Sequence, residues 1–441
     1  MSTSNSNEKI EIIKEILKAI HRGEKIEELK KRFESILQQV SPFEIPLIEQ
    51  QLVKEGISVD EVLKLCDLHV ELFRESLQSR ELKNIPKGHP LDLLMKENEW
   101  VLKQAESIGL YASALLKAKD HEQTRNYLAS LKKAASEMRK ARLHYRKIQM
   151  LVFPYLERRG IVAVPRVLWG REDQAMVKLR QLSELLQKTE ADVNKALIND
   201  IANKAIEIAQ EFSELVFREN RILFPAVQAL FSEGEWAAIA EIAEDLGYVV
   251  DIKSERWKTD AKPILPYELK VSVTPEQVEK LPPEFRSMAI SHGVEPDTYN
   301  VKKEGDLDLG TGFLSIEETK ALFRALPIEI TFANSDDRVK FFTESSLHKG
   351  FVRTKTIIGR KIEYCHPPRL ENIVRKNVNE IKISGTEHRE FWTKMGDRTV
   401  RVLIAPVRNQ KGSLLGVVEV VEDLTEVVNN TDEVKNKIMV I

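Results

Sequence analysis

Residues 144–161 read HYRKIQMLVFPYLERRGI and contain the end of a long predicted helix that covers residues 121–157. Further helical runs are expected near residues 91–118, 171–188, 191–222 and 233–246. Helices of this length joined by short turns are typical of an up-and-down bundle. The stretch ERRGIVAVPRVLWG, residues 157–170, contains a proline and is expected to be a connection that packs over one end of the bundle.

The rest of the chain divides at changes in pattern. Before the bundle, apolar residues such as Ile12, Ile16 and Ile20 recur at the spacing of an amphipathic helix. After the bundle, residues 249–311 hold six of the 17 prolines and are expected to form a partly ordered connector across the bundle that allows domain movement. The predicted divisions are an N-terminal all-helical module (1–82), the bundle (83–248), the connector (249–311), a mixed α and β domain (312–428) and a tail (429–441).

The mixed domain has a clear order of elements. Ser315 and Glu318 have the spacing of a capping box and predict the start of a helix in SIEETKALFRAL. PIEITFANSDDRVKFFTES then predicts strand, turn and strand, because β-rich runs flank the turn-forming NSDD. After a helical middle, turns at Gly396–Asp397 and Lys411–Gly412 separate three predicted antiparallel strands, HREFWTKM, TVRVLIAPVRN and LLGVVEVVEDL.

Composition restricts location and partners. The 441 residues exceed one ordinary core, and a net charge of -2 gives no overall attraction to nucleic acid or anionic membranes. No segment approaches the roughly 20 apolar residues that span a bilayer, and the N-terminus lacks the pattern of a secretion signal. Cys66 and Cys365 are far apart and indicate free thiols in a reducing compartment. We expect a cytoplasmic protein with no membrane contact, and the net charge does not indicate direct nucleic-acid binding, although a local basic patch is still allowed.

The sequence contains no P-loop, GxSxG elbow, dinucleotide fingerprint, kinase signature or zinc-protease motif. Nothing in it supplies a nucleophile, a base and an oxyanion donor together. We therefore predict a protein that is not an enzyme and has no catalytic residues.

Six short stretches, in their order and spacing, resemble one protein family. They are LCDLHVELF (65–73), KGHP (87–90), HYRKIQMLVFPYLERRGI (144–161), PRVLWG (165–170), RILFP (221–225) and IIGRKIEYCHPP (357–368). In that family a domain of unknown function precedes a hemerythrin-like bundle and a C-terminal PAS domain. The resemblance implies a multidomain α plus α/β fold with an N-terminal helical module, a hemerythrin-like up-and-down four-helix bundle, and a PAS domain of antiparallel sheet and helices.

The resemblance also implies a metal pair in the bundle, but most of its ligands are missing. No histidine occurs between His144 and His292, Asp92 stands where the family often has a second histidine, and Gln149 stands where it often has a glutamate. Two such ions need several imidazoles and bridging carboxylates. We therefore expect a bundle that has lost its metals, so iron is not favoured. The alternative is a single metal ion held by His89, Asp92, His144 and Glu219.

Two cysteine–histidine pairs are further candidates. Cys66 and His69 lie three residues apart on a predicted helix, so both can face the same side. Two interpretations are open: they form half of a metal site, or they are a buried thiol beside a hydrogen-bonded histidine. Cys365 and His366 precede two prolines. Three interpretations are open for this pair: ligands of a haem or metal, a thiol that responds to oxidants, or only a structural turn. Aromatic residues on the predicted strands line a ligand cavity or belong to the core: Phe332, Phe341, Phe342, Phe391 and Trp392.

These observations favour a cytoplasmic, non-enzymatic sensory or regulatory protein whose PAS domain binds a small ligand or a partner. Its signal is expected to leave through an unidentified protein or macromolecular assembly, and the resemblance implies a homodimer formed through the PAS domain. A second hypothesis is an interaction protein that docks on the transcription or translation machinery under stress. A third is an iron or haem protein that senses oxygen, nitric oxide or redox state.

Overall fold

The computed structural model describes residues 84–189, 194–252, 256–269, 296–345, 353–383 and 387–438, with a few isolated positions before residue 84. The chain divides into two compact units, Met1–Tyr299 and Asn300–Ile441. Cys66 and His69 lie outside the described residues, as does almost all of the predicted N-terminal module. Within the described part of the chain, no helix has both the length and the apolar character needed to cross a membrane.

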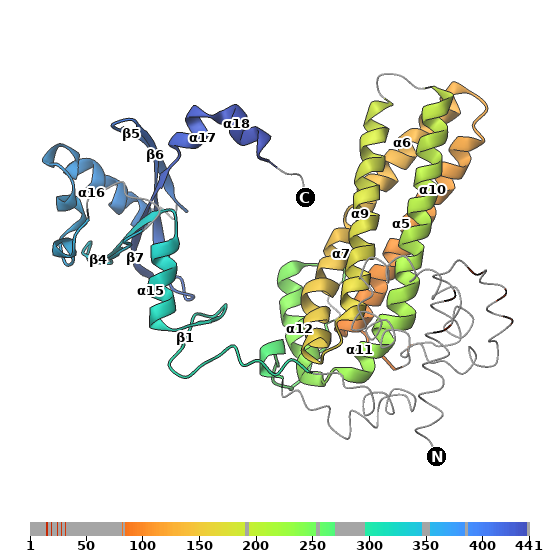
Figure 1. Cartoon of the computed structure of the whole chain (residues 1–441), viewed down its shortest axis with the longest axis horizontal. Coiled ribbons are helices and arrows are strands. Elements are labelled where there is room, and N and C mark those ends of the chain that lie inside the picture. The colour runs from red at the N-terminus through yellow and green to blue at the C-terminus, as the bar shows by residue number, and fades with distance from the viewer. Residues whose placement is uncertain are drawn as a thin grey trace, which may run out of the picture. The chain divides into compact units, whose positions relative to one another are not determined.

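Four long helical segments pack together in the first unit (Figure 1). They are α5, Pro90–Leu116; α6, His121–Met138, which α7, Ala141–Lys147, continues; α9, Ala163–Lys188; and α10, Lys195–Arg218. Helices α5 and α9 each pack against both α6 and α10, which closes the four into a ring. The predicted four-helix bundle is confirmed.

Shorter helical pieces complete this unit. They are the π-helical turns η1, Ile148–Val152, and η2, Glu219–Leu223; the α-helices α8, Phe153–Arg158, α11, Phe224–Leu230, and α12, Glu233–Leu246; and the 3-10 turn η3, Pro266–Glu268. Helix α12 confirms the short helix predicted near 233–246.

Helix α9 begins earlier than the sequence predicted. Residues 163–170 were expected to belong to a connection, but α9 starts at Ala163. Pro165 is the third residue of the helix, where the missing N–H has no intrahelical partner in any case. The turn before it needs only Gly160, whose φ of 77° lies in the left-handed region that favours glycine. A proline in the first turn therefore started this helix instead of interrupting it.

The described part of the connector lies against one end of the bundle. Trp257 N–H donates to Gly88 O at 3.2 Å, and Ile264 N–H donates to Gly234 O at 3.0 Å. The Tyr155 hydroxyl of α8 donates to Ile264 O at 2.8 Å. Residues 256–269 therefore form a strap, held to α12 and α8 by backbone as well as side-chain contacts.

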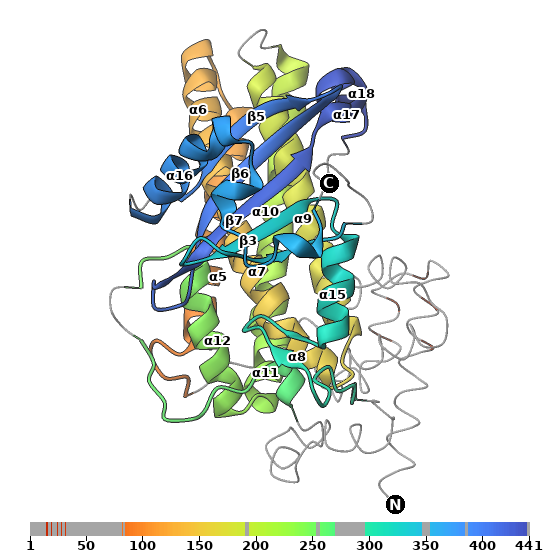
Figure 2. The same ribbon diagram turned by 90° about the vertical axis from the view of Figure 1, so that its left-hand side faces the viewer.

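The second unit is an antiparallel sheet with helices, as predicted. Its strands follow the order β4-β3-β7-β6-β5 and lie side by side in Figure 2. Their bounds are β3, Glu329–Asn334; β4, Val339–Phe342; β5, Arg389–Met395; β6, Arg398–Arg408; and β7, Leu414–Asp423. The tight turn between β3 and β4 contains Asp337 with a φ of 62°, which confirms the turn predicted at NSDD.

The helices and small strands of this unit are α15, Ile316–Ala325; α16, Pro368–Ile383; α17, Thr425–Asn429; α18, Thr431–Asn436; the 3-10 turns η4, Lys355–Ile357, and η5, Ile362–Cys365; and the pair β1, Leu307–Asp308, and β2, Phe313–Leu314. Ser315 and Glu318 make the predicted capping box at the start of α15. A small apolar core holds Ala333 and Val417 of the sheet against Val378 of α16.

We expect Gly234→Ala to destabilise the first unit by about 1–3 kcal/mol, as overpacking does. A Cβ at this position would lie 2.7 Å from Lys262 O and 2.8 Å from the Ile264 side chain, so the strap would have to move. Gly109→Ala in α5 is the matched control, because its Cβ would meet Ala209 at an ordinary 3.5 Å. That change should stabilise the bundle by up to about 1 kcal/mol through helix propensity. Urea unfolding of both variants measures the difference, and equal effects would contradict the tight strap.

Candidate functional site

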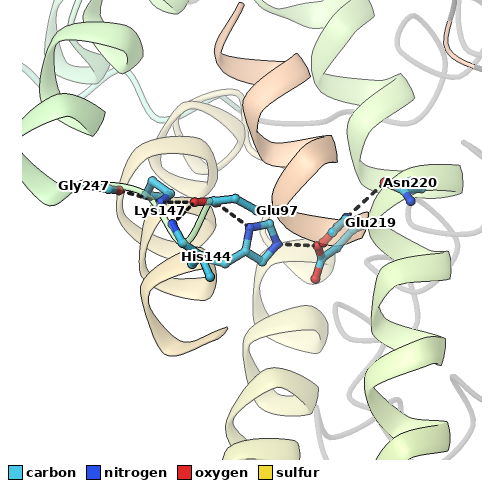
Figure 3. Close-up of polar contacts among 8 residues, drawn as sticks. Glu97, His144, Lys147, Glu219, Asn220 and Gly247 are labelled. Atoms are coloured by element: carbon cyan, nitrogen blue, oxygen red, sulfur yellow. Dashed lines mark hydrogen bonds and ion pairs between the residues drawn. The ribbon is translucent and has the colours of Figure 1, made fainter. Parts of the chain in front are cut away.

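The centre of the bundle holds a buried histidine between two carboxylates (Figure 3). Glu97 on α5 lies 2.9 Å from His144 Nδ1, and Glu219 at the start of η2 lies 2.9 Å from His144 Nε2. All three side chains are 0% exposed. Burial alone would lower the pKa of His144, but the charges and hydrogen bonds of Glu219 and Glu97 raise it to about 9. The ring is therefore an imidazolium that donates from both nitrogens.

Lys147 supplies a second buried positive charge. It follows His144 by three residues, and its ammonium nitrogen lies 2.6 Å from Glu97 Oε1. The same nitrogen donates to Gly247 O at 2.7 Å, and Val249 N–H donates to Glu97 Oε1 at 2.8 Å. Burial works against the ionised form of Glu97, but His144 and Lys147 together hold its pKa below the usual value. The cluster therefore binds the first residues after α12, where the chain leaves the bundle.

Glu172 on α9 is the uncharged member of the cluster. It is fully buried and its Oε2 accepts a hydrogen bond of 2.6 Å from Gln149 Nε2. Burial, followed by the nearby charge of Glu219, raises the pKa of Glu172 to about 8. The carboxyl group is therefore protonated at neutral pH. The formal charges of Glu97 and Glu219 then cancel those of His144 and Lys147, as buried charges require.

These residues form one polar layer between two apolar cores. In α5 the layer holds Glu97 and Asn98, with one core ending at Leu94 and the other beginning at Val101. The other three helical segments change from one core to the other at the same level, around His144, Glu172 and Glu219. Asn98 on α5 donates to Asn220 on η2 at 3.0 Å, which adds a neutral link within the layer.

Two π-helical turns border the layer. Phe153 N–H donates to Ile148 O, and Phe224 N–H donates to Glu219 O, each five residues back instead of four. A proline follows each phenylalanine, and its ring would clash with the carbonyl four residues earlier. A widened turn relieves that clash, and such turns often occur at functional sites. The motifs LVFP and ILFP thus predict the local geometry that places Glu219 opposite His144.

Family models match three successive parts of the chain. Residues 13–79 match a family of unknown function, residues 89–227 match the hemerythrin HHE cation binding domain, and residues 319–425 match a PAS domain. The predicted three-domain order is confirmed. The first match lies almost entirely outside the described residues, whereas the second contains the whole polar layer.

Solved structures match parts of the chain. A C-terminal domain from Streptococcus mutans is 29% identical, covering 29% of this chain and 99% of its own, with a TM-score of 0.27. A sensory box sensor histidine kinase from Vibrio cholerae is 12% identical, covering 24% and 88%, with a TM-score of 0.20. The sensor region of a sensor histidine kinase is 18% identical, covering 23% and 40%, with a TM-score of 0.19. No protein of curated function matches the chain.

The described residues of the hemerythrin-like bundle do not offer a ligand set for a metal pair. Both nitrogens of His144 face carboxylates, and the ammonium group of Lys147 lies where Glu97 would have to bind a cation. Among the described residues, no group of three or more histidine, cysteine, aspartate or glutamate side chains is arranged to hold a metal ion. The carboxylates present therefore bind the N–H groups of His144 and the ammonium group of Lys147, and this set does not fit two metal ions.

The structure corrects the four-residue metal set of the sequence analysis. Only His144 and Glu219 meet, whereas His89 caps α5 and packs edge-on against Trp236 and Trp257 at 4.9 and 4.7 Å. Burial lowers the pKa of His89 to about 4, so its ring is neutral. Asp92 accepts from Gly88 N–H and pairs with Lys96. Eight residues separate His89 from Glu97, or about 12 Å along a helix.

Three ionisable members of the layer escaped the sequence analysis, namely Glu97, Lys147 and Glu172, as did the neutral pair Asn98 and Asn220. Glu97 offered a signal, because it lies four residues after Leu93 and four before Val101, on the apolar face of α5. A carboxylate on such a face must find a partner. Lys147 lies one turn after His144, so both point to one side of the helix.

The candidate ligand residues of the PAS domain do not surround one cavity. The strand register places Phe342 and Phe391 on the sheet face that carries Thr331, and it places Phe332, Phe341 and Trp392 on the opposite face. Phe341 and Trp392 are also exposed. The predicted aromatic lining is therefore corrected to two groups on two faces.

Cys365 and His366 lie at the end of η5. Burial raises the pKa of Cys365, which favours the thiol over the thiolate that haem ligation and fast oxidation need. His366 Nδ1 lies 3.0 Å from Ile362 O. On the Thr331 face, Arg353 donates to Thr331 Oγ1 at 2.8 Å and to Glu419 Oε1 at 3.1 Å, and it also pairs with Glu329. These contacts fit the structural turn beside an ion cluster, and haem or metal ligation by Cys365 and His366 stays a prediction.

We expect the stability of the bundle to fall as the pH rises above neutral. His144 and Glu172 have folded pKa values of about 9 and about 8, above their reference values of 6.5 and 4.5. Each contribution is therefore complete below the reference value and is lost as the pH rises through the folded value. Glu172→Gln removes one of these losses. Compared with the natural protein, it should be near neutral at about pH 4.5 and more stable by at least about 1 kcal/mol at about pH 9, because the contribution of Glu172 is lost between these two values.

Urea unfolding at both pH values checks this expectation. Asp173→Asn, at the exposed neighbouring residue, is the matched control and should change stability equally at both. If Glu172→Gln changed the free energy of unfolding by the same amount at both pH values, Glu172 could not be protonated at neutral pH.

Lys147→Met should destabilise the bundle by about 3–5 kcal/mol, because it leaves Glu97 short of a buried partner. Lys178→Met is the matched control. Lys178 also pairs with glutamates, Glu207 and Glu211, but its side chain is 36% exposed, so a change of only about 0–1 kcal/mol is expected. Chemical denaturation at neutral pH compares the two, and similar losses would argue against the buried pair.

Proposed function

We propose that the chain is a cytoplasmic, non-enzymatic regulatory protein whose bundle is a salt-bridged scaffold without a metal pair. A PAS domain together with a hemerythrin-like bundle supports a sensory or regulatory role. The observation that carries this proposal is the contact of Glu97 and Lys147 with the segment at Gly247–Val249. That segment leads from the bundle toward the PAS domain.

The proton chemistry of the layer supports a role without catalysis. A general base needs a free lone pair within reach of a substrate, and the imidazolium of His144 has none. The carboxylates of Glu97 and Glu219 are taken up in neutralising it. Release of His144 would take from Glu219 its buried cation and leave Glu97 with Lys147 alone, which is costly.

The link to Gly247–Val249 gives the proposal a physical route. The two hydrogen bonds tie the exit of α12 to the ion pair, and Lys147 also lies 4.7 Å from the centre of the Tyr248 ring. A shift in the layer would therefore change the population of the docked Gly247–Val249 segment, and a shift in that segment would act back on the layer. The partner that receives this change would be an unidentified protein or assembly. One candidate partner is a second copy of the chain, bound through the PAS domain. Trp392 favours it, because this side chain is 54% exposed on the sheet face opposite Thr331.

Two measurements on the purified full-length chain test the proposal. Elemental analysis should find no stoichiometric iron, manganese or zinc, and a chelator should leave the unfolding temperature unchanged, because the ion pairs replace the metals. Hydrogen exchange of Lys147→Met should be faster at Gly247–Val249 than in the natural protein, with the α5 amides around Val101–Ala112 as the internal reference. Two tightly bound irons per chain would replace the regulatory proposal with oxygen chemistry. Unchanged exchange at Gly247–Val249 would remove the route through Lys147.

A further inference from the structure

A pocket on the side of the bundle reaches the polar layer between α7 and α9. It has a volume of about 190 Å³. Tyr145 and Glu172, which are 2% and 0% exposed, form its floor, and the exposed Arg142 and Arg146 lie at its rim. The pocket thus ends at one carboxyl group of the layer, which is itself buried.

The floor presents polar atoms with no partner. Glu172 Oε1 and Tyr145 Oη are buried, and neither has a hydrogen-bond partner among the described residues. Buried polar atoms are nearly always satisfied, so a molecule from outside is expected to reach them. Gln149 donates to the other oxygen of Glu172, which leaves the carboxyl proton for Oε1. At neutral pH the floor therefore offers two O–H donors.

The rim presents positive charge. Arg142 and Arg146 are one helical turn apart, and in the part of the chain that the structure describes neither forms an ion pair with a carboxylate. Asp173 lies at the same rim, so the three rim residues carry a net charge of one positive unit. Guanidinium groups bind carboxylates with matching geometry. Donors at the floor and cations at the rim select against amines and other cations.

We propose that this pocket binds a small organic carboxylate. Its carboxylate group would lie at Arg142 and Arg146, and a second oxygen would accept from Glu172 and Tyr145. The pocket volume is several times the roughly 30 Å³ that one water occupies in the liquid, so a molecule the size of pyruvate or lactate fits. This assignment does not depend on the regulatory role, because binding at the pocket can be measured whether or not the strap responds.

Isothermal titration of the full-length chain with pyruvate, lactate and acetate tests the site, with methylammonium and inorganic phosphate as comparisons. Pyruvate and lactate should bind more tightly than acetate, which lacks the second oxygen, and methylammonium should not bind. Arg142→Gln combined with Arg146→Gln should weaken pyruvate at least about tenfold, and Arg139→Gln, an exposed arginine outside the pocket, should leave it unchanged.

Tyr145→Phe separates binding from folding. The hydroxyl has no partner in the described structure, so its removal should not lower the unfolding temperature, yet it should weaken pyruvate about fivefold. No saturable binding by the natural protein, or binding that survives the double arginine change, would overturn the proposal. Phosphate that binds as tightly as pyruvate with the same dependence on the arginines would overturn the carboxylate assignment, because it would show an unselective anion site.

Discussion

The imidazolium of His144 can remain charged inside the bundle only because two carboxylates meet it from two other helices. An isolated charge in such a medium would lose its proton, and the energy of placing it there falls only when opposite charges are fixed at hydrogen-bond distance. Glu97 and Glu219 provide those charges at 2.9 Å on either side of the ring. This requirement fixes the heights of α5, α7 and η2 relative to one another. Apolar packing alone tolerates small sliding movements, whereas a pair of buried charges does not.

The polar layer accounts for a hemerythrin-like bundle without its usual donors. A metal pair and the present cluster would do the same thing: each supplies positive charge that neutralises carboxylates between two apolar cores. Here one imidazolium and one ammonium group carry the positive charge, and Glu172 remains neutral by keeping its proton. The arrangement neutralises the carboxylates while the two apolar cores stay packed on either side of the layer. It also brings Lys147 close enough to hold Gly247, a contact that belongs to the lysine side chain.

Local sequence signals predicted the elements well because their causes are local. Apolar spacing located the long helices, the spacing of Ser315 and Glu318 located the start of α15, and NSDD located the turn between β3 and β4. The site was harder to predict, because its contacts join residues that are 47 and 75 positions apart. His89 illustrates the difficulty. Its identity suggested a ligand, but its position at the helix start makes it a cap, and only the neighbouring tryptophans show where its ring lies.

Buried ion clusters often reduce stability compared with an apolar core, so their retention needs a reason. In this bundle the cluster gives two things that leucines could not give. It binds polar backbone of the segment after α12, at Gly247 and Val249, and it places a protonated carboxyl group at the floor of a pocket. Both contacts belong to one buried polar layer, in which Glu172 interacts electrostatically with Glu219 and His144, and the layer takes residues from all four helical segments. A change at one edge therefore alters the balance of charges that holds the other edge, and this makes the layer the physical link between the bundle and the segment that leaves it.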